Sequence, residues 1–290
     1  MLNRVLDLVG SEGWFDTKLP YEKTVLLTHG AAHCVVLSRD GRPDTFVKFS
    51  ELASLEIEAQ RCRRASHDFA GVAPHFVGHG ARPPLEVLVT RAEDFGHVTV
   101  ELFERPGTRA RLLAGLERYF TLMRGAATGG AAARTPAGWL DDLSGYFAAS
   151  PGTPSVAAAI DMLRHALAEL PAVPQHGDLV ANNLGLRPDG TLVVFDWEDY
   201  GAVDLPGLDL FTLDMSLGPP AAAHGCGLPP SAIERCAAAL GLAADGYRRL
   251  APGYALVFRY LKRNYSPEVR ARVDALLERV SAAPDGRAAR

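Results

Sequence analysis

Three oxygen-bearing side chains have types and spacing that could do chemistry: Asp178, Asn183 and Asp196. Asn183 follows Asp178 by five positions, and Asp196 follows it by 18. Two short apolar runs, joined by the turn sequence Arg-Pro-Asp-Gly at 187–190, lie between Asn183 and Asp196 and predict a β-hairpin. We therefore expect the chain to fold back and bring the three side chains to one place. Two carboxylates and an amide oxygen suit Mg²⁺ held jointly with a phosphate group, so the pattern indicates phosphoryl transfer.

The segment resembles the aminoglycoside phosphotransferase and choline kinase group of small-molecule kinases, which has a protein-kinase-like fold. The resemblance is carried by His176-Gly-Asp178, by Asn183 and by Asp196-Trp-Glu. It implies that Asp178 is the catalytic base and that Asn183 and Asp196 hold metal. His176 would brace the loop by hydrogen bonding. Asp and Asn also favour turns and caps, and either one alone would more often be a turn residue. The joint pattern favours the catalytic interpretation.

Lys48 is the basic residue most in need of an explanation, because it lies between Val47 and Phe49 in an alternating strand pattern at 45–49. An unpaired buried ammonium is costly, so the lysine needs a partner. It could be an edge-strand charge that deters aggregation. In the kinases it would contact the α/β-phosphates while a helix glutamate steadies it. The following segment has a helical pattern from 51 to 64 and offers Glu58, which we favour, or Glu56.

The rest of the N-terminal part predicts an antiparallel sheet of five strands, preceded by a short helix over 2–10. The loop 28–33, centred on Gly30, resembles the turn that covers phosphates in the family, although a plain hairpin turn is an equal alternative. The last strand, with Val89 and Arg91, would lead into a hinge whose backbone binds the purine edge of a nucleotide.

Beyond the hinge the pattern becomes helical. Pro206-x-x-Asp209-Leu resembles a family element in which the Asp caps a helix and ties back to the catalytic loop, so we interpret Asp209 as structural. Ser231-Ala-Ile-Glu234 has the spacing of a capping box that opens a helix. We expect an N-terminal nucleotide-binding lobe over residues 1–93 and a helical lobe, with the catalytic loop and the acceptor site, over 94–290.

Composition limits the other classes of protein. The 48% hydrophobic content and the mean hydropathy of +0.01 fit a globular protein, and no apolar run approaches the length of a membrane span. A formal net charge of −4 without a basic block makes a nucleic-acid partner a poor hypothesis. The four cysteines lack C-x-x-C spacing and framework density, so we expect free thiols and a cytoplasmic location.

The sequence thus predicts an α+β protein-kinase-like fold of two lobes, a five-stranded antiparallel N-lobe and a mostly helical C-lobe. The expected function is transfer of the γ-phosphoryl group of ATP or GTP, with Mg²⁺, to a hydroxyl of a small molecule. A catalytically silent nucleotide-binding regulator is the alternative, and a metal-dependent phosphohydrolase would leave Lys48 without a role. The acceptor stays open between an aminoglycoside, choline or another amino alcohol, and a sugar. The oligomeric state is also open. Asp199, Asp204 and Asp214 could line an acidic mouth for a cationic acceptor, or could be loop charges and caps.

Overall fold

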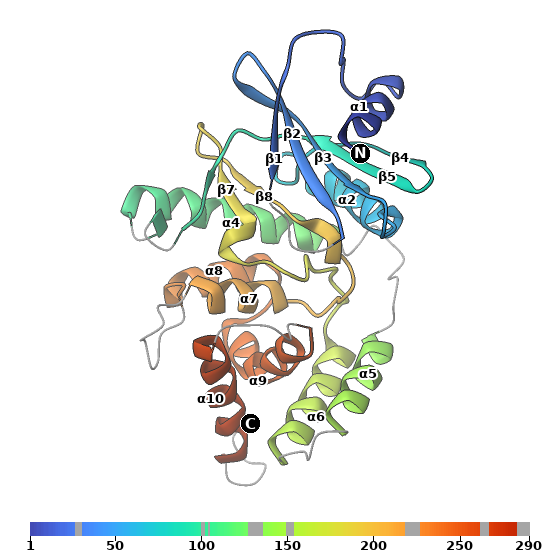
Figure 1. The fold of residues 1–290 in the computed structure, drawn as a ribbon. Coiled ribbons are helices and arrows are strands. Elements are labelled where there is room, and N and C mark those ends of the chain that lie inside the picture. The colour runs from blue at the N-terminus through green and yellow to red at the C-terminus, as the bar shows by residue number, and fades with distance from the viewer. Residues whose placement is uncertain are drawn as a thin grey trace. The chain divides into compact units, whose positions relative to one another are not determined.

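The N-terminal sheet is formed by five antiparallel strands, as the sequence predicts, and their order is β1-β2-β3-β5-β4 (Figure 1). The structure is a computed structural model that describes residues 1–26, 31–99, 102–103, 105–126, 136–148, 154–217, 227–261 and 267–282. The strands are β1 (Glu22–Leu26), β2 (His33–Arg39), β3 (Arg42–Ser50), β4 (Phe76–Arg82) and β5 (Leu85–Arg91). Asp40 and Gly41 both have positive φ, at 49° and 71°, as in the two-residue turns that commonly join the strands of a hairpin, here β2 and β3.

Two helices cover the two faces of this sheet. The helix α1 (Leu2–Ser11) packs its apolar side on the face that contains Val47 and Phe49. Successive side chains of a strand alternate between faces, so Lys48 points to the other face. Leu88, the cross-strand neighbour of Lys48, packs there against the N-terminal part of α2 (Glu56–Asp68). The alternation in β3 therefore directs the lysine toward α2.

The start of α2 differs from the expected helix over 51–64. The side-chain oxygen of Ser50 accepts hydrogen bonds from the N–H groups of Leu52 and Ala53, at 3.0 and 2.9 Å. This local turn after β3 competes with helix formation, because a serine side chain can replace a backbone acceptor. The helix begins only at Glu56.

A second, three-stranded sheet contains the hairpin predicted between Asn183 and Asp196. Its order is β6-β7-β8, with β6 (Gly96–His97), β7 (Leu184–Leu186) and β8 (Leu192–Val194). One 3₁₀ turn, η1 (Ala181–Asn183), precedes the hairpin, and another, η2 (Trp197–Asp199), follows it. Leu184 lies opposite Val194 in the antiparallel pairing, so the two ends of the hairpin are held together.

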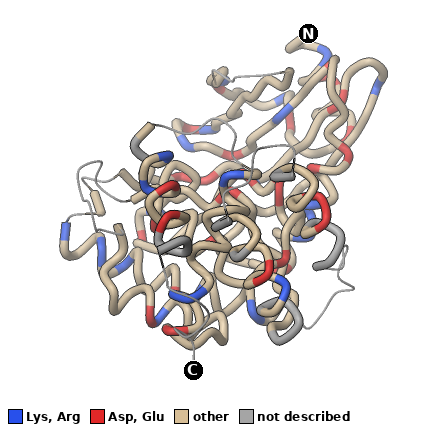
Figure 2. Tube along the Cα trace, turned by 90° about the horizontal axis from the view of Figure 1, so that it is seen from below, with Lys and Arg blue, Asp and Glu red and all other residues tan. Residues whose placement is uncertain are grey.

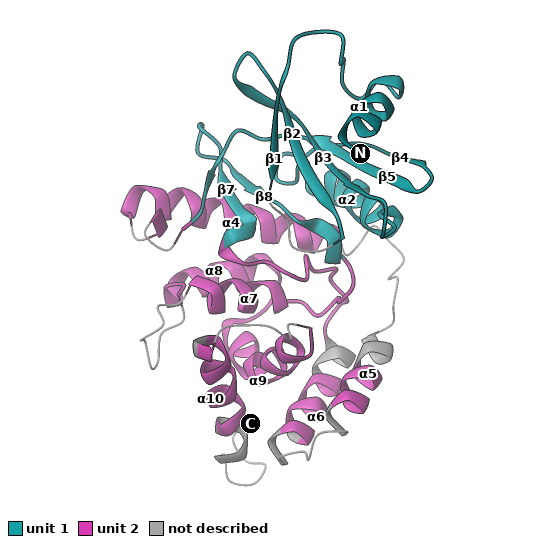
Figure 3. Ribbon diagram, viewed as in Figure 1, with its two compact units in different colours: residues 1–98, 182–200 teal, residues 99–181, 201–290 magenta. Residues whose placement is uncertain are grey.

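The chain forms two compact units, which Figure 3 shows in different colours. The first comprises 1–98 and 182–200 and contains both sheets, α1 and α2. The second comprises 99–181 and 201–290 and is helical. Its helices are α4 (Pro106–Ala126), α5 (Pro136–Ala148), α6 (Pro154–Glu169), α7 (Leu208–Leu217), α8 (Pro230–Ala239), α9 (Ala244–Leu261) and α10 (Pro267–Ala282). The predicted division into two lobes, 1–93 and 94–290, stays a prediction.

The predicted capping box at the start of α8 is wrong. The helix begins one residue before Ser231, with Pro229 as N-cap and no side-chain capping bond. Proline is favoured in the first helical turn, where its missing N–H is not needed, so Pro230 starts the helix and Ser231 falls inside it. Glu234 instead accepts a hydrogen bond from Arg248 at 2.6 Å.

The distribution of charged residues and the state of the described cysteines agree with what the composition predicts. Figure 2 shows basic and acidic positions interspersed along the trace of the described residues. Cys34, Cys62 and Cys236 are free thiols. Within the ranges that the structure describes, no helix is both long and apolar enough to span a membrane.

Candidate active site

Lys48 lies at the centre of a charged group in the first unit. Its Nζ donates to Oε1 of Glu58 at 2.8 Å and to Oε2 of Glu198 at 3.1 Å. The Lys48 and Glu58 side chains are only 18% and 16% exposed, whereas that of Glu198 is 49% exposed. Burial alone would lower the pKa of Lys48, but the hydrogen bonds and charges of the two glutamates outweigh it and raise that pKa. Lys48 therefore stays positively charged, with one half-buried partner, Glu58, and one exposed partner, Glu198.

The helix register selects Glu58 over Glu56 as the partner of Lys48. Glu58 is half-buried toward the sheet, and burial raises the pKa of its carboxyl against the opposing effect of Lys48. Glu56 is exposed in the first turn of α2 and accepts a hydrogen bond from Gln60 at 3.4 Å. The two-residue step between the glutamates places them on different sides of the helix, so only one can reach β3.

We expect Lys48→Met to lower kcat/KM for the nucleotide by roughly 10²-fold, because in the predicted role a fixed cation at the non-transferred phosphates positions the nucleotide and stabilises its charge. The variant also leaves the half-buried Glu58 beside another carboxylate. We expect a loss of stability of about 1–3 kcal/mol that is larger at pH 8 than at pH 5, where protonation of Glu58 relieves it. Steady-state kinetics and urea unfolding at the two pH values measure both effects. Equal stability losses at both pH values, with unchanged kinetics, would contradict this role.

The hairpin brings Asn183 and Asp196 together. The N–H of Phe195 donates to the carbonyl oxygen of Asn183 at 2.9 Å, immediately before Asp196. Asp196 has φ 62° and ψ 60°, a left-handed conformation that is uncommon outside glycine. Its side chain is exposed, and that of Asn183 is half-buried. Non-glycine residues with this conformation are found at functional sites as well as in turns.

The turn after Asp196 is anchored to α2. The indole N–H of Trp197 donates to the carbonyl of Val194 at 2.7 Å, and its ring packs against Phe69 with centroids 4.8 Å apart. The hydroxyl of Tyr200 donates to Asp68 at 2.8 Å, at the end of α2. These contacts hold the segment with Asp196 and Glu198 against the helix that carries Glu58.

Asp178 belongs to the second unit, in a loop held by backbone hydrogen bonds to a buried carboxylate. Asp209, in the first turn of α7, accepts from the N–H groups of His176 at 2.7 Å and Gly177 at 3.0 Å, and from the hydroxyl of Tyr119 at 3.1 Å. The fully buried His176 accepts from the N–H of Asp178 through Nδ1 at 3.3 Å. These contacts support the structural interpretation of both residues. The position of Asp178 relative to Asn183 and Asp196 stays a prediction.

Complete burial raises the pKa of Asp209 from 3.8 to about 6, against the opposing effect of its three hydrogen bonds. Because the folded state holds this proton more tightly than the unfolded chain, its stabilisation is complete below about pH 4 and is lost as the pH rises through 6. We expect the free energy of unfolding of the wild type, minus that of Asp209→Asn, to fall by up to about 3 kcal/mol from pH 4 to pH 6. Urea unfolding of both proteins across this range measures it, and a constant difference would refute it.

The remaining predicted nucleotide contacts are distributed as follows. Val89 is fully buried in β5, and the side chain of Arg91 pairs with Asp44 at 2.9 Å. The N–H of Arg91 donates to the carbonyl of His75, and that of Ala92 to the carbonyl of Asp44. Both N–H donors are thus engaged inside the unit, and a purine contact at this segment stays a prediction. Gly30 lies outside the described residues.

A model of the phosphotransferase enzyme family matches residues 26–252, which include the strand lysine, the His-Gly-Asp loop and the hairpin. The chain belongs to this family. This phosphotransferase is therefore a small-molecule kinase, as the motifs predict. No curated protein sequence matches the chain.

Solved structures confirm the protein-kinase-like α+β fold. A thermostable mutant of aminoglycoside phosphotransferase APH(4)-Ia, in a ternary complex with ADP and hygromycin B, has 14% identity and a TM-score of 0.63, covering 97% of this chain and 98% of that chain. A choline/ethanolamine kinase family protein from Mesorhizobium loti has 20% identity and a TM-score of 0.57, covering 98% and 94%. The streptomycin–ATP–APH(2″)-IIa complex has 11% identity and a TM-score of 0.59, covering 95% of both chains.

The oxygen donors of the phosphotransferase fit Mg²⁺. Asn183 offers an amide oxygen and Asp196 a carboxylate, both hard ligands. In the part of the chain that the structure describes, no group of three or more His, Cys, Asp or Glu side chains could hold a metal ion by itself. A magnesium ion on this pair would therefore take further ligands from phosphate oxygens and water, as is usual for this ion.

Sequence reasoning missed one member of the charged group, Glu198. It follows Asp196 by two positions, and the only available signal was the third letter of the Asp-Trp-Glu motif.

The structure does not favour the interpretation of Asp199, Asp204 and Asp214 as an acidic mouth for a cationic acceptor. Asp204 and Asp214 are only 6% and 3% exposed, and Asp214 accepts a hydrogen bond from the N–H of Leu228. Asp199 forms an ion pair with Arg61 at 3.9 Å.

Proposed function

We propose that this phosphotransferase moves the γ-phosphoryl group of ATP or GTP to a hydroxyl group of a small molecule. The observation that carries the proposal is the 2.8 Å ion pair between Lys48 and Glu58. A half-buried lysine held by a helix glutamate is the phosphate-binding arrangement of kinases. The hydrogen bond from the N–H of Phe195 to the carbonyl of Asn183 holds Asn183 beside the residue that precedes Asp196, and the two side chains supply oxygen donors of the kind that Mg²⁺ prefers.

In the proposed reaction the acceptor oxygen bonds to the γ-phosphorus while the bond from that phosphorus to the bridging oxygen breaks, which releases the nucleoside diphosphate. The carboxylate of Asp178 orients the acceptor hydroxyl and takes its proton. Lys48 holds the non-transferred phosphates, and Asn183 and Asp196 hold the metal. Bound Mg²⁺ would neutralise charge on the phosphate oxygens. The protein contributes mainly position and charge, since this chemistry needs no covalent intermediate.

The acceptor class is proposed from the structural relatives, whose names include hygromycin B, streptomycin and choline or ethanolamine. These share a hydroxyl on a polar small molecule, and two of the three groups are aminoglycosides. A hydroxylated, cationic small molecule is therefore the acceptor class to test first. The burial of Asp204 and Asp214 means that neither carboxylate lies at the surface to bind such a cation.

The proposal is tested by measuring nucleoside diphosphate production with purified protein, Mg²⁺ and ATP or GTP against a panel of acceptors. The panel contains aminoglycosides, choline, ethanolamine, sugars and other hydroxylated metabolites. We expect at least one acceptor to raise diphosphate production above the acceptor-free rate, and mass spectrometry to detect its phosphate ester. Binding of Mg·ATP without an ester from any acceptor would favour the silent regulator instead.

A further inference from the structure

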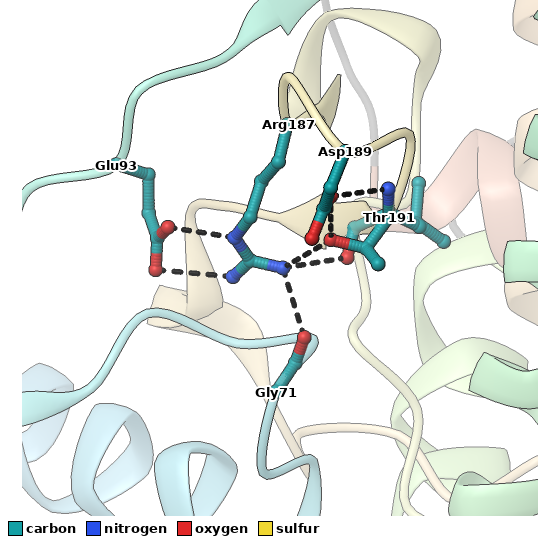
Figure 4. Close-up of polar contacts among 6 residues, drawn as sticks. Gly71, Glu93, Arg187, Asp189 and Thr191 are labelled. Carbon is teal, nitrogen blue, oxygen red and sulfur yellow. Dashed lines mark hydrogen bonds and ion pairs between the residues drawn. The ribbon is translucent and has the colours of Figure 1, made fainter.

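Arg187 occupies the turn of the hairpin and uses its whole guanidinium group (Figure 4). Its Nε and Nη2 donate to the two carboxylate oxygens of Glu93, at 2.8 and 3.1 Å. Its Nη1 donates to the carbonyls of Gly71 at 2.9 Å and Leu192 at 3.2 Å, and to the hydroxyl of Thr191 at 3.3 Å. Both Arg187 and Glu93 are only 18% exposed. A two-pronged, half-buried pair of this kind fixes orientation as well as distance.

The turn itself is built to present this side chain. Gly190 has φ 84°, and its N–H donates to the carbonyl of Arg187 at 2.8 Å. Asp189 accepts from the N–H and the hydroxyl of Thr191 at 2.8 and 2.7 Å. These local bonds close the turn without the side chain of Arg187, so the guanidinium is not needed to form it. Besides Thr191 and Leu192 of the hairpin, the guanidinium contacts Glu93 and Gly71, which belong to other segments of the same unit.

Through Glu93, Arg187 binds the hinge, the segment that follows β5. Glu93 lies two residues after the end of β5, and β6 follows at once, pairing Gly96 with Leu186 of β7. The ring of Phe95 packs on Phe195 with centroids 4.2 Å apart. An added Cβ at Gly185 would clash with the Phe95 ring. The hinge is therefore in direct contact with the hairpin of β7 and β8, which lies between Asn183 and Asp196.

We propose that Arg187 and Glu93 are positioning residues that fix the distance between the hinge and the metal-holding end of the hairpin. The proposal rests on the proposed function, with the metal at the hairpin bound to the nucleotide phosphates, and on the predicted contact between the hinge and the purine. A nucleotide has a set length from purine to γ-phosphate, so both ends bind together only if these two places keep a fixed separation. A small misplacement between binding groups is enough to lose this joint fit.

The proposal makes a prediction that a purely structural ion pair does not. A ligand that touches both ends must lose affinity when the pair is broken, whereas one that touches only the hairpin must not. Mg·ADP is the first kind of ligand, and Mg·pyrophosphate is the second. Loss of general stability would affect neither ligand below the melting temperature, and a damaged hairpin would affect both.

The experiment compares dissociation constants for the two ligands, by calorimetry, in the wild type and in Arg187→Met, Glu93→Gln and the double variant. We expect each single variant to raise the dissociation constant for Mg·ADP at least five-fold. The double variant should bind Mg·ADP no more weakly than the single variant with the lower affinity, since the residues act as one pair. Mg·pyrophosphate should stay within two-fold throughout. Arg187→Lys keeps the charge without the two-pronged geometry and should give an intermediate loss of Mg·ADP affinity. This variant provides the test if Arg187→Met does not fold.

Arg4→Ala is the matched control, because it removes another arginine–glutamate pair of the same unit, to Glu51 at 2.8 Å. It should leave both dissociation constants within two-fold of the wild type. Parallel weakening of both ligands in the Arg187 variants, or no weakening of Mg·ADP, overturns the positioning role. A wild type that binds neither ligand refutes the proposed function itself, so the two failures are distinguishable.

Discussion

Asp178→Asn should reduce phosphoryl transfer by at least about 10³-fold while the dissociation constant for Mg·ATP changes less than three-fold. The amide cannot take the proton of the acceptor hydroxyl, yet it has nearly the same shape as the carboxylate. The loop should keep its fold, because Asp209 holds it through the N–H groups of His176 and Gly177 rather than through the Asp178 side chain. Initial rates with a saturating acceptor, together with calorimetric titration of Mg·ATP, measure the two quantities.

Asp161→Asn is the control for this prediction. Asp161 lies on α6 in the same unit, its side chain is 67% exposed, and it pairs with the nearby Arg164 at 3.4 Å. Its substitution makes the same chemical change and should leave the rate unaltered. An Asp178→Asn variant that turns over within ten-fold of the wild type would remove Asp178 from the mechanism.

Asp196→Ala should lower the transfer rate by roughly 10²–10³-fold and abolish its dependence on Mg²⁺, because Asn183 alone cannot hold the metal. Part of any effect could come from the backbone, since Ala is strained at the positive φ of Asp196. Asp196→Asn avoids this strain, because Asn tolerates the left-handed conformation, while it still removes the charge. Rates measured across a range of Mg²⁺ concentrations for both variants separate the two contributions.

Asp40 provides a matched control, since it is the other non-glycine residue with positive φ among the described residues. Asp40→Ala carries comparable backbone strain in the turn between β2 and β3. We expect it to reduce stability by about 1–2 kcal/mol and leave the Mg²⁺ dependence intact. If Asp40→Ala and Asp196→Ala lowered activity equally, the effect of Asp196 would be one of folding, and its metal role would be lost.

Local patterns predicted the parts of the site that are built from neighbouring residues. The hairpin followed from two apolar runs and the turn sequence at 187–190, and the alternation around Lys48 placed that residue on the face opposite Val47 and Phe49. The helical period of α2 narrowed the partner to two glutamates. In each of these places, the residues that decide the geometry lie close together in the sequence.

Contacts between distant segments could not be predicted in this way. Glu198 reaches Lys48 from 150 positions along the chain, and Arg187 reaches Glu93 from 94 positions away. In the sequence Arg187 was only the first residue of a turn. No local signal distinguishes an arginine that points to solvent from one that forms an ion pair with the hinge. The capping box failed for a different, local reason, since the adjacent proline had a stronger effect than the serine and glutamate spacing.

The most direct test of the account follows the γ-phosphoryl group itself. Purified protein is incubated with Mg²⁺ and nucleotide labelled at the γ-phosphorus, with the acceptor that most stimulates diphosphate release, and the label is counted in the phosphate ester and in inorganic phosphate. The account predicts that the wild type places most of the label in the ester and that Asp178→Asn places almost none there. Label found only in inorganic phosphate, or an ester formed equally well by both proteins, would contradict it.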